Sequence, residues 1–268
     1  VDVKWILPRL IGLFLVLNLA ACGGGLTPPA SPTADSAPSN RPIAPNRDLQ
    51  KSLPAVCDCV LRFDHLNLEQ GLSQSSVNVI FQDSRGFMWF GTEDGLNRYD
   101  GYTFKTYKPD PDVPESLSDR WITAIVEDAE GYLWIGTRQG GLNRFDPRSG
   151  LFATFKHDPT DKNSLSNNRI NTLYLGENNT LWVGTDTDLD RFNRTRETFA
   201  HYLSDEDGLK NPITTLFQDS AGFLWIGIRD NGLYQLNERT NSIKAFTTGA
   251  NTGTLSDNNI TSITEDTE

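Results

Sequence analysis

The sequence predicts an all-β protein made of tandem four-stranded antiparallel units, and three observations support this prediction. One motif occurs four times, as GFMWFGTEDGLNRYD, GYLWIGTRQGGLNRFD, NTLWVGTDTDLDRFN and GFLWIGIRDNGLYQLN. The tryptophans of these copies are 45, 48 and 43 residues apart along the chain. Short apolar and β-branched runs alternate with turns rich in Gly, Asp and Asn, whereas a helical hydrophobic period is absent.

A period in the forties is typical of a β-propeller blade, which is a four-stranded meander. In the second copy the pattern predicts four strands joined by tight turns, at 122–127, 133–137, 142–146 and 152–157. We therefore expect four complete propeller blades, a partial fifth blade and a ring that is incomplete in this chain. The expected blades cover about 77–108, 121–157, 169–203 and 212–246, with the start of the next at 259–268.

The partial fifth blade is indicated by Leu255, which matches a leucine found 17 residues before the tryptophan in three copies, at Leu72, Leu117 and Leu165. An incomplete ring would leave apolar blade faces open. Two interpretations remain. The chain is the leading fragment of a longer receptor, or it is a short protein that covers its open faces by self-association.

Glycines recur at two turn positions of the motif and predict backbone with positive φ. At the first position the third copy carries Asn179 in place of glycine, and at the second it carries Asp188. Because Asn and Asp tolerate the left-handed region better than other residues, we expect both to adopt it. The glycines they replace are Gly86, Gly131 and Gly222 at the first position, and Gly95, Gly141 and Gly232 at the second.

One tryptophan per copy occupies the same strand position, at Trp89, Trp134, Trp182 and Trp225. Burial of a tryptophan removes about 150–250 Å² of surface from water. We expect these residues to form the core between neighbouring blades. The alternative is an exposed platform for stacking carbohydrate.

The N-terminus has the pattern of an export signal with a lipid attachment site. Lys4 and Arg9 precede the apolar run 10–21, which is too short to span a bilayer core. The following sequence LAACG resembles the lipobox of bacterial lipoproteins and assigns Cys22 as the lipidated residue, although an uncleaved anchor is the alternative. We expect a signal peptide over 1–22, a disordered Pro- and Ser-rich tether over 23–55 and the propeller repeats over 56–268.

Charge and cysteine content exclude several partner classes. The formal net charge is −11 and no Lys/Arg cluster occurs, so a nucleic-acid partner is not expected. Cys57 and Cys59 could close a strained disulfide or contribute to a metal site, but they are more simply incidental residues at a domain edge. We expect no metal and no cofactor.

The motifs GYLWIGT, GLNRFD and NSLSNNRI, together with the opening segment from RFDHLNLEQGLSQSS, resemble the two-component regulator propeller repeat family. Its members are extracytoplasmic sensor propellers on the N-terminal side of hybrid histidine kinases. The resemblance implies a ligand-binding sensor in a phosphorelay, located in the periplasm or at the cell surface. It further implies a histidine kinase domain in a full-length form and an extracellular ligand, often an oligosaccharide from polysaccharide breakdown.

Candidate binding residues lie in the loops that lead into the first strands of the second and third blades. Arg120, Trp121 and Arg169 are expected near the mouth of the propeller channel, where Arg side chains could bind carboxylate or sulfate groups of a glycan. The alternative is that these residues are ordinary solvated loop side chains.

An enzymatic function is not expected. Streptogramin lyases are propellers of similar appearance that need a histidine and a metal at the central axis, whereas His65, His157 and His201 all fall on or beside predicted outer strands. We identify no catalytic residue. A remaining alternative is a lipid-anchored propeller that acts as a scaffold or binding protein without kinase coupling.

Overall fold

The computed structural model describes residues 65–203, 211–249 and 254–266. The expected signal peptide, the tether, Cys22 and the Cys57–Cys59 pair lie outside the described residues. Among the residues that are described, no helix has the length and apolar character needed to cross a membrane.

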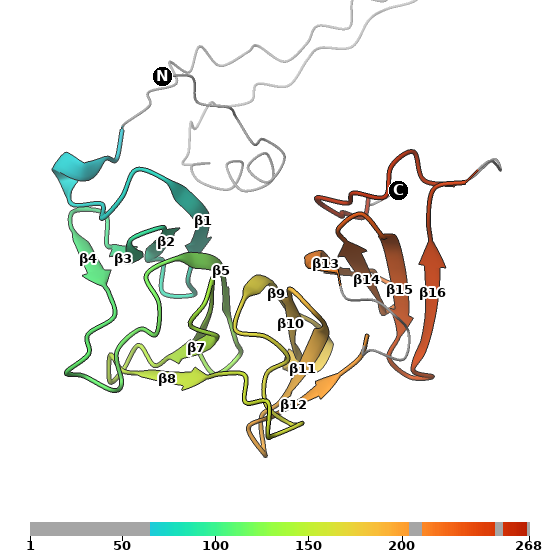
Figure 1. Cartoon of the computed structure of the whole chain (residues 1–268). Helices are drawn as coiled ribbons and strands as arrows, with labels where there is room; N and C mark the ends of the chain where they lie inside the picture. The colour runs from blue at the N-terminus through green and yellow to red at the C-terminus, as the bar shows by residue number, and fades with distance from the viewer. Residues whose placement is uncertain (1–64, 204–210, 250–253, 267–268) are drawn as a thin grey trace, which may run out of the picture. The chain divides into compact units, whose positions relative to one another are not determined.

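The described residues form four antiparallel sheets of four strands each, and the sheets follow one another in chain order (Figure 1). This confirms the predicted all-β fold of propeller blades. Blade 1 contains β1 (Val77–Gln82), β2 (Met88–Thr92), β3 (Gly95–Tyr99) and β4 (Phe104–Tyr107). Blade 2 contains β5 (Ile122–Glu127), β6 (Leu133–Thr137), β7 (Leu142–Phe145) and β8 (Phe152–Phe155). Blade 3 contains β9 (Ile170–Leu175), β10 (Leu181–Thr185), β11 (Leu189–Asn193) and β12 (Thr198–His201). Blade 4 contains β13 (Ile213–Gln218), β14 (Phe223–Ile228), β15 (Gly232–Asn237) and β16 (Ser242–Phe246).

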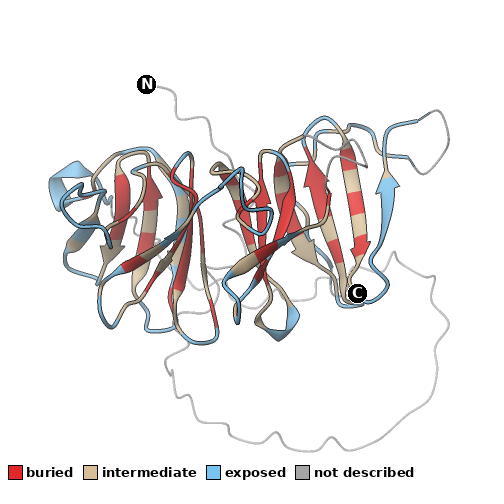
Figure 2. Ribbon diagram, turned by 60° about the horizontal axis from the view of Figure 1, so that its bottom comes forward, coloured by how far each residue is buried: buried red, intermediate tan, exposed pale blue. Residues whose placement is uncertain are grey.

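Two single-turn 3-10 helices accompany the sheets, η1 (Leu68–Gln70) before blade 1 and η2 (Glu177–Asn179) between β9 and β10. The first strands of successive blades contact one another, β1 with β5, β5 with β9 and β9 with β13. We call these the inner strands, and the fourth strand of each blade the outer strand. Buried residues concentrate on the two middle strands of the blades, whereas the outer strands are more exposed (Figure 2).

Apolar layers between neighbouring blades form the core. Trp89, Trp134 and Trp182 are fully buried, whereas Trp225 of blade 4 is only half-buried. Each of the three fully buried tryptophans packs with residues of the following blade; Trp134, for example, meets Phe192 edge to face at 4.8 Å between ring centroids. The tryptophan of one blade and the apolar face of the next therefore form one hydrophobic unit.

A glycine in the second strand lets the inner strand of the next blade approach closely. A Cβ atom on Gly136 would lie 2.6 Å from Cγ2 of Ile170, and the same relation holds between Gly184 and Ile213 at 2.7 Å. Because no real Cβ makes contacts this short, the Gly of the Trp-x-Gly motif is required by packing between blades. This glycine has no special φ, so its role is steric and not conformational.

The two turn positions behave differently in blade 3. Asn179 adopts φ of 61°, as expected, in line with the positive φ of the matching glycines. The expectation for Asp188 was wrong, because this residue is not among those with positive φ. Its turn is closed by side chains instead: the Asp188 N–H donates to Thr185 Oγ1 at 2.9 Å, and its carboxylate accepts from the N–H of Leu189 and of Leu203, both at 2.7 Å.

The segment 254–266 occupies the place of a next inner strand beside blade 4. Ile260 lies over Gly227, where a Cβ would come within 3.1 Å of the Ile260 Cβ. Ser220 donates from its N–H and its hydroxyl to the Glu265 carboxylate at 2.9 and 2.8 Å. The same double contact joins Ser84 of blade 1 to Glu127 of blade 2. The segment therefore contacts blade 4 as β5 contacts blade 1.

Candidate functional site

The predicted binding residues belong to one end of the sheets. The first residue of β5, Ile122, pairs with Thr137 at the end of β6, and Ile170 of β9 likewise pairs with Thr185 of β10. The loops that lead into the inner strands therefore lie beside the turns that follow the second strands. We call this end the loop face and define it by residues 92–95, 118–121, 137–141, 166–169 and 185–188.

Trp121 is stacked with an arginine that the sequence reasoning did not single out. The Arg138 guanidinium carbon lies 4.0 Å from the centroid of the Trp121 ring, and the Arg138 N–H donates to the Trp121 carbonyl at 3.0 Å. Asp119 braces the backbone beside the pair, because its carboxylate accepts from the backbone N–H of Trp121 at 3.3 Å and from that of Gln139, the residue after Arg138, at 2.8 Å. The result is a half-buried cation–π pair on a braced backbone.

Arg169 forms a second pair on the neighbouring loop. Its Nε lies 3.3 Å from Asp186 Oδ2, and the Asp186 N–H donates to the Arg169 carbonyl at 3.2 Å. Asn171 Nδ2 donates to the other Asp186 oxygen at 3.0 Å. The Arg169 side chain is 42 % exposed, so its two terminal nitrogens can reach an external ligand.

Arg120 is the most exposed of the three predicted residues. Its side chain is 69 % exposed, and its only ion pair among the described residues is a 3.9 Å contact with Asp94. Lys108 holds the same carboxylate more closely, at 2.7 Å. The Arg120 carbonyl has a structural role, because it accepts from Gly95 N–H of blade 1 at 2.7 Å and so links neighbouring blades.

Sequence reasoning missed Arg138 of this face and Arg229 at the corresponding position of blade 4. Both follow the end of a second strand. The backbone N–H of Arg138 donates to the carbonyl of Trp121 and that of Arg229 to the carbonyl of Pro212, and each acceptor residue precedes an inner strand. The signal was present in the motif copies, as GTRQGG and GIRDNG. The loop face therefore presents several arginines on a chain whose net charge is strongly negative.

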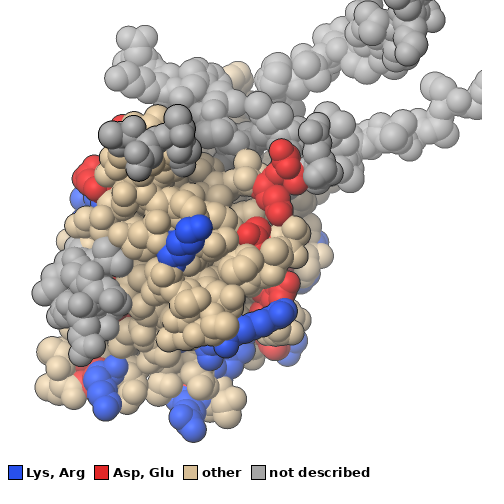
Figure 3. Space-filling model, turned by 90° about the vertical axis from the view of Figure 1, so that its right-hand side faces the viewer, with Lys and Arg blue, Asp and Glu red and all other residues tan. Residues whose placement is uncertain are grey.

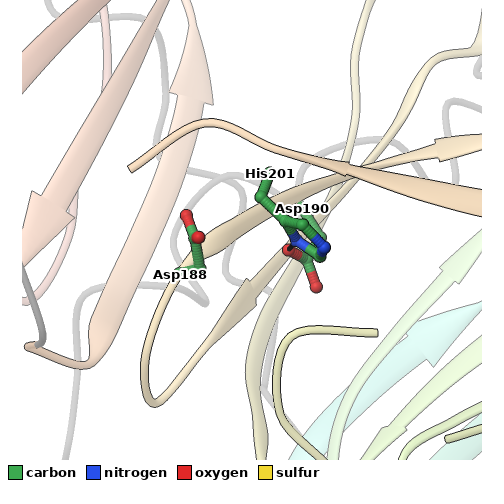
Figure 4. Close-up of side chains that lie close together, drawn as sticks. All are labelled: Asp188, Asp190 and His201. Atoms are coloured by element: carbon green, nitrogen blue, oxygen red, sulfur yellow. Dashed lines mark hydrogen bonds and ion pairs between the residues drawn. The ribbon is translucent and has the colours of Figure 1, made fainter. Parts of the chain in front are cut away.

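A charged cluster extends inward from this face in blade 3, formed by the buried Asp188 and Asp190 and the half-buried His201 (Figure 4). One ligand-type atom from each lies within 4.8 Å of the others, which is close enough to consider a metal ion. However, both ring nitrogens of His201 are occupied, one by Asp190 Oδ1 at 2.6 Å and the other by the Lys162 carbonyl at 2.9 Å. The hydrogen bond that His201 donates to the Asp190 carboxylate raises the pKa of His201 to about 9, so the ring is an imidazolium in an ion pair.

This cluster replaces uncharged residues of the other copies. In blade 1 the position of Asp190 is Asn97, which accepts from Ser73 N–H at 3.0 Å, and Asp190 accepts from Ser166 N–H at 2.8 Å in the same way. The position of His201 is Thr106 in blade 1. Alignment of the four copies could therefore have found the cluster, whereas the sequence reasoning placed His201 on an outer strand and did not pair it.

A family model for the two-component regulator propeller matches residues 71–94, 116–139, 164–187 and 207–230. The chain is built from two-component regulator propeller repeats. The matched segments contain the loops into the inner strands and the first two strands of each blade, and they include Arg120, Trp121, Arg138 and Arg169. This is the repeat of sensor propeller domains in histidine kinase systems.

Solved structures and one curated protein are similar to the repeat region, and this chain covers only a minor part of each of them. The extracellular domain of BT3049, assigned to a hybrid two-component system of B. thetaiotaomicron, is 29 % identical with a TM-score of 0.62. The match covers 69 % of this chain and 26 % of that domain. Histidine kinase P4 of Formosa agariphila is 56 % identical over 48 residues, which are 18 % of this chain and 4 % of that protein. The extracellular domain of BT4673 of B. thetaiotaomicron matches with 20 % identity, a TM-score of 0.48, and coverage of 74 % and 37 % of the two chains.

Proposed function

We propose that the chain is the extracytoplasmic ligand-binding module of a two-component signalling receptor and forms the N-terminal portion of a longer protein. Ligand binding at the propeller would bias a conformational equilibrium that a histidine kinase domain reads in the full-length form. The repeat family and the similarity to the BT3049 extracellular domain support this proposal.

The stacked Trp121–Arg138 pair beside the Arg169 loop is the observation that carries the ligand-binding proposal. An aromatic face with adjacent guanidinium groups suits a sugar ring that bears a carboxylate or sulfate, because the ring stacks while the anion accepts charge-assisted hydrogen bonds. Arg120 is a further cation on the same face. We therefore infer an anionic oligosaccharide as the ligand class.

Calorimetric titration with two probes, oligogalacturonate and a sulfated galactan oligosaccharide, tests this proposal. Arg169→Ala is expected to weaken binding about 10-fold or more, since a hydrogen bond to a charged group contributes about 1.5–3 kcal/mol. Trp121→Ala is expected to weaken binding as well, because it removes the stacking surface and the ring that positions Arg138. Arg148→Ala is the matched control, because this exposed arginine lies on the turn between β7 and β8, away from the loop face. The proposed ligand site would be refuted if neither probe binds, or if Arg148→Ala loses as much affinity as Trp121→Ala and Arg169→Ala.

The open blade faces support the proposal of a longer protein. In blades 2 to 4 one face of each sheet is covered by the preceding blade; Ile125, for example, is 5 % exposed. The matching residue of blade 1, Ile80, is 46 % exposed. At the other end of the series, the surface seen in Figure 3 is mainly uncharged, with basic side chains near its middle and at its lower edge and acidic side chains along one side. The exposed face of blade 1 therefore has the character of a blade interface.

We also propose that Cys22 carries a lipid that anchors the protein to a bacterial membrane. The support is the short apolar run followed by LAACG. Mass spectrometry of the N-terminal peptide is expected to show a diacylglyceryl group on Cys22. In the Cys22→Ala variant no lipidated mature protein is expected in the membrane fraction. An unmodified Cys22 in a membrane-bound product would instead identify an uncleaved anchor.

A further inference from the structure

The junction between blades 3 and 4 differs chemically from the other junctions of the described chain. At three neighbouring positions where blade 2 has Gly141, Asn143 and Thr154, blade 3 carries the charged cluster of Asp188, Asp190 and His201. Asp188 and Asp190 are buried, with 6 % and 0 % exposure. The repeat itself therefore provides an uncharged reference for each member of the cluster.

Asp188 is connected directly to the core that blades 3 and 4 share. Its carboxylate accepts the N–H of Leu203, which is 1 % exposed and packs in one cluster with Trp182 of blade 3 and Ile213 of blade 4. The charged groups that face Asp188 are Asp190 of β11 and His201 of β12. Protonation of Asp188 therefore changes the acceptor of the Leu203 N–H, and Leu203 packs at the edge of this interface.

A second carboxyl group faces the same interface from blade 4. In the other blades the tryptophan indole donates to an aspartate of its own blade, as Trp134 does to Asp128, but Gly176 stands at that position in blade 3. The Trp182 N–H has no acceptor with good hydrogen-bond geometry among the described residues, and Glu238 of blade 4 interacts with this indole. The charged groups that face Glu238 are Arg191 and Glu177 of blade 3, and Gln218 Nε2 donates to it at 3.1 Å.

The preceding junction has the opposite arrangement. There Arg194 of blade 3 donates to Asp128 of blade 2 at 2.7 Å, and Trp134 donates to the same carboxylate oxygen. Burial raises the pKa of Asp128, but the hydrogen bonds from Arg194 and Trp134 outweigh it and leave the pKa below its usual value. This contact is therefore lost as the pH falls, which is the usual behaviour of a paired carboxylate.

We propose that the junction between blades 3 and 4 is a proton-sensitive joint, which holds the two blades together more tightly in mild acid than at neutral or alkaline pH. The proposal rests on the contact of the buried Asp188 carboxylate with Leu203 at one edge of the interface, and on Glu238 of blade 4 facing the Trp182 indole. It is independent of the ligand proposed above.

The titrating groups of this joint all act in the same direction. Burial raises the pKa of Asp188 to about 6, and Asp190 adds to this rise, while the N–H groups of Leu203 and Leu189 oppose it. Burial also raises the pKa of Glu238. A raised carboxyl pKa means that the folded joint binds the proton more tightly than the open one, so stability is lost as the pH rises through the folded pKa. The pKa of His201 is raised to about 9, so its ion pair with Asp190 is likewise lost as the pH rises through this value.

Hydrogen exchange of the full chain, corrected for the pH dependence of intrinsic exchange, tests the joint. Protection of amides in β11–β13 is expected to fall about 10-fold between about pH 5 and pH 7.5, from the Asp188 shift alone. Asp188→Asn keeps the acceptor oxygen for Leu203 but cannot ionise, so its protection is expected to fall less steeply with pH than wild type in this range and to be higher than wild type at about pH 7.5.

Asp230→Asn is the matched control, because Asp230 is an exposed residue of the equivalent turn in blade 4. It is expected to keep the wild-type pH dependence. Glu238→Gln provides a second variant and is expected to reduce the pH dependence. Wild-type protection that is constant or increases from about pH 5 to 7.5, or an Asp188→Asn variant with wild-type pH dependence, would overturn the proposal.

Discussion

At the scale of single residues, the repeat works as an internal control because four copies of each position occur in one chain. Trp89, Trp134 and Trp225 each donate their indole N–H to an aspartate six residues earlier. Trp182 lacks this aspartate and instead faces Glu238 from the next blade. Such departures from the repeat mark the places where a blade has acquired a different role, and they are visible only once the four copies are compared position by position.

The glycine in the second strand has a role that can be tested at this scale. Gly136→Ala is expected to destabilise the fold by about 1–3 kcal/mol, because the new methyl group overpacks against Ile170. Ile170→Ala should relieve the clash, so the double variant is expected to lose less free energy of unfolding than the two single variants together. The measurement is chemical denaturation of all four proteins of the cycle. Strict additivity would show that the two residues do not touch in the folded protein.

At the scale of elements, the sequence predicted the strands of each blade well because alternation, turn glycines and the Trp-x-Gly motif all indicate the same meander. It did not predict that Asp188 has a negative φ. The Asp188 carboxylate accepts from the N–H groups of Leu189 and Leu203, and these side-chain contacts close the turn. It also did not pair Trp121 with Arg138, since Trp121 precedes β5 and Arg138 follows β6, and the two meet only through the register of these strands. Loop contacts of this kind depend on tertiary pairing and not on local pattern.

The junctions between blades are also elements, and they are not equivalent. Between blades 2 and 3 the ion pair of Arg194 with Asp128 contributes stability at neutral pH, whereas between blades 3 and 4 buried carboxyls reduce it. Opposite responses to protons at adjacent junctions would let a change of pH redistribute strain along the series of blades without altering any single sheet.

At the scale of the molecule, the described blades form a series with an open face on blade 1 and a partly covered face on blade 4. Ile80 is exposed where its counterparts in the other blades are buried, and Trp225 is half-buried where the other tryptophans are fully buried. Exposed apolar surface of this kind is normally covered by further structure or by another molecule. The proposal of a longer receptor and the alternative of self-association therefore differ in what covers these faces.

Light scattering of the 268-residue chain beside a chain extended through the downstream reading frame distinguishes the two. If the chain is part of a longer propeller, the extended protein is expected to be monomeric and cooperatively folded, whereas the shorter chain associates without a defined stoichiometry. Ile80→Ser is expected to reduce that association, and Leu151→Ser is the matched control, because Leu151 is 48 % exposed but lies on the turn between β7 and β8. A shorter chain that forms one defined oligomer, dissociated by Ile80→Ser alone, would instead establish self-association as the way in which the faces are covered and would refute the longer receptor.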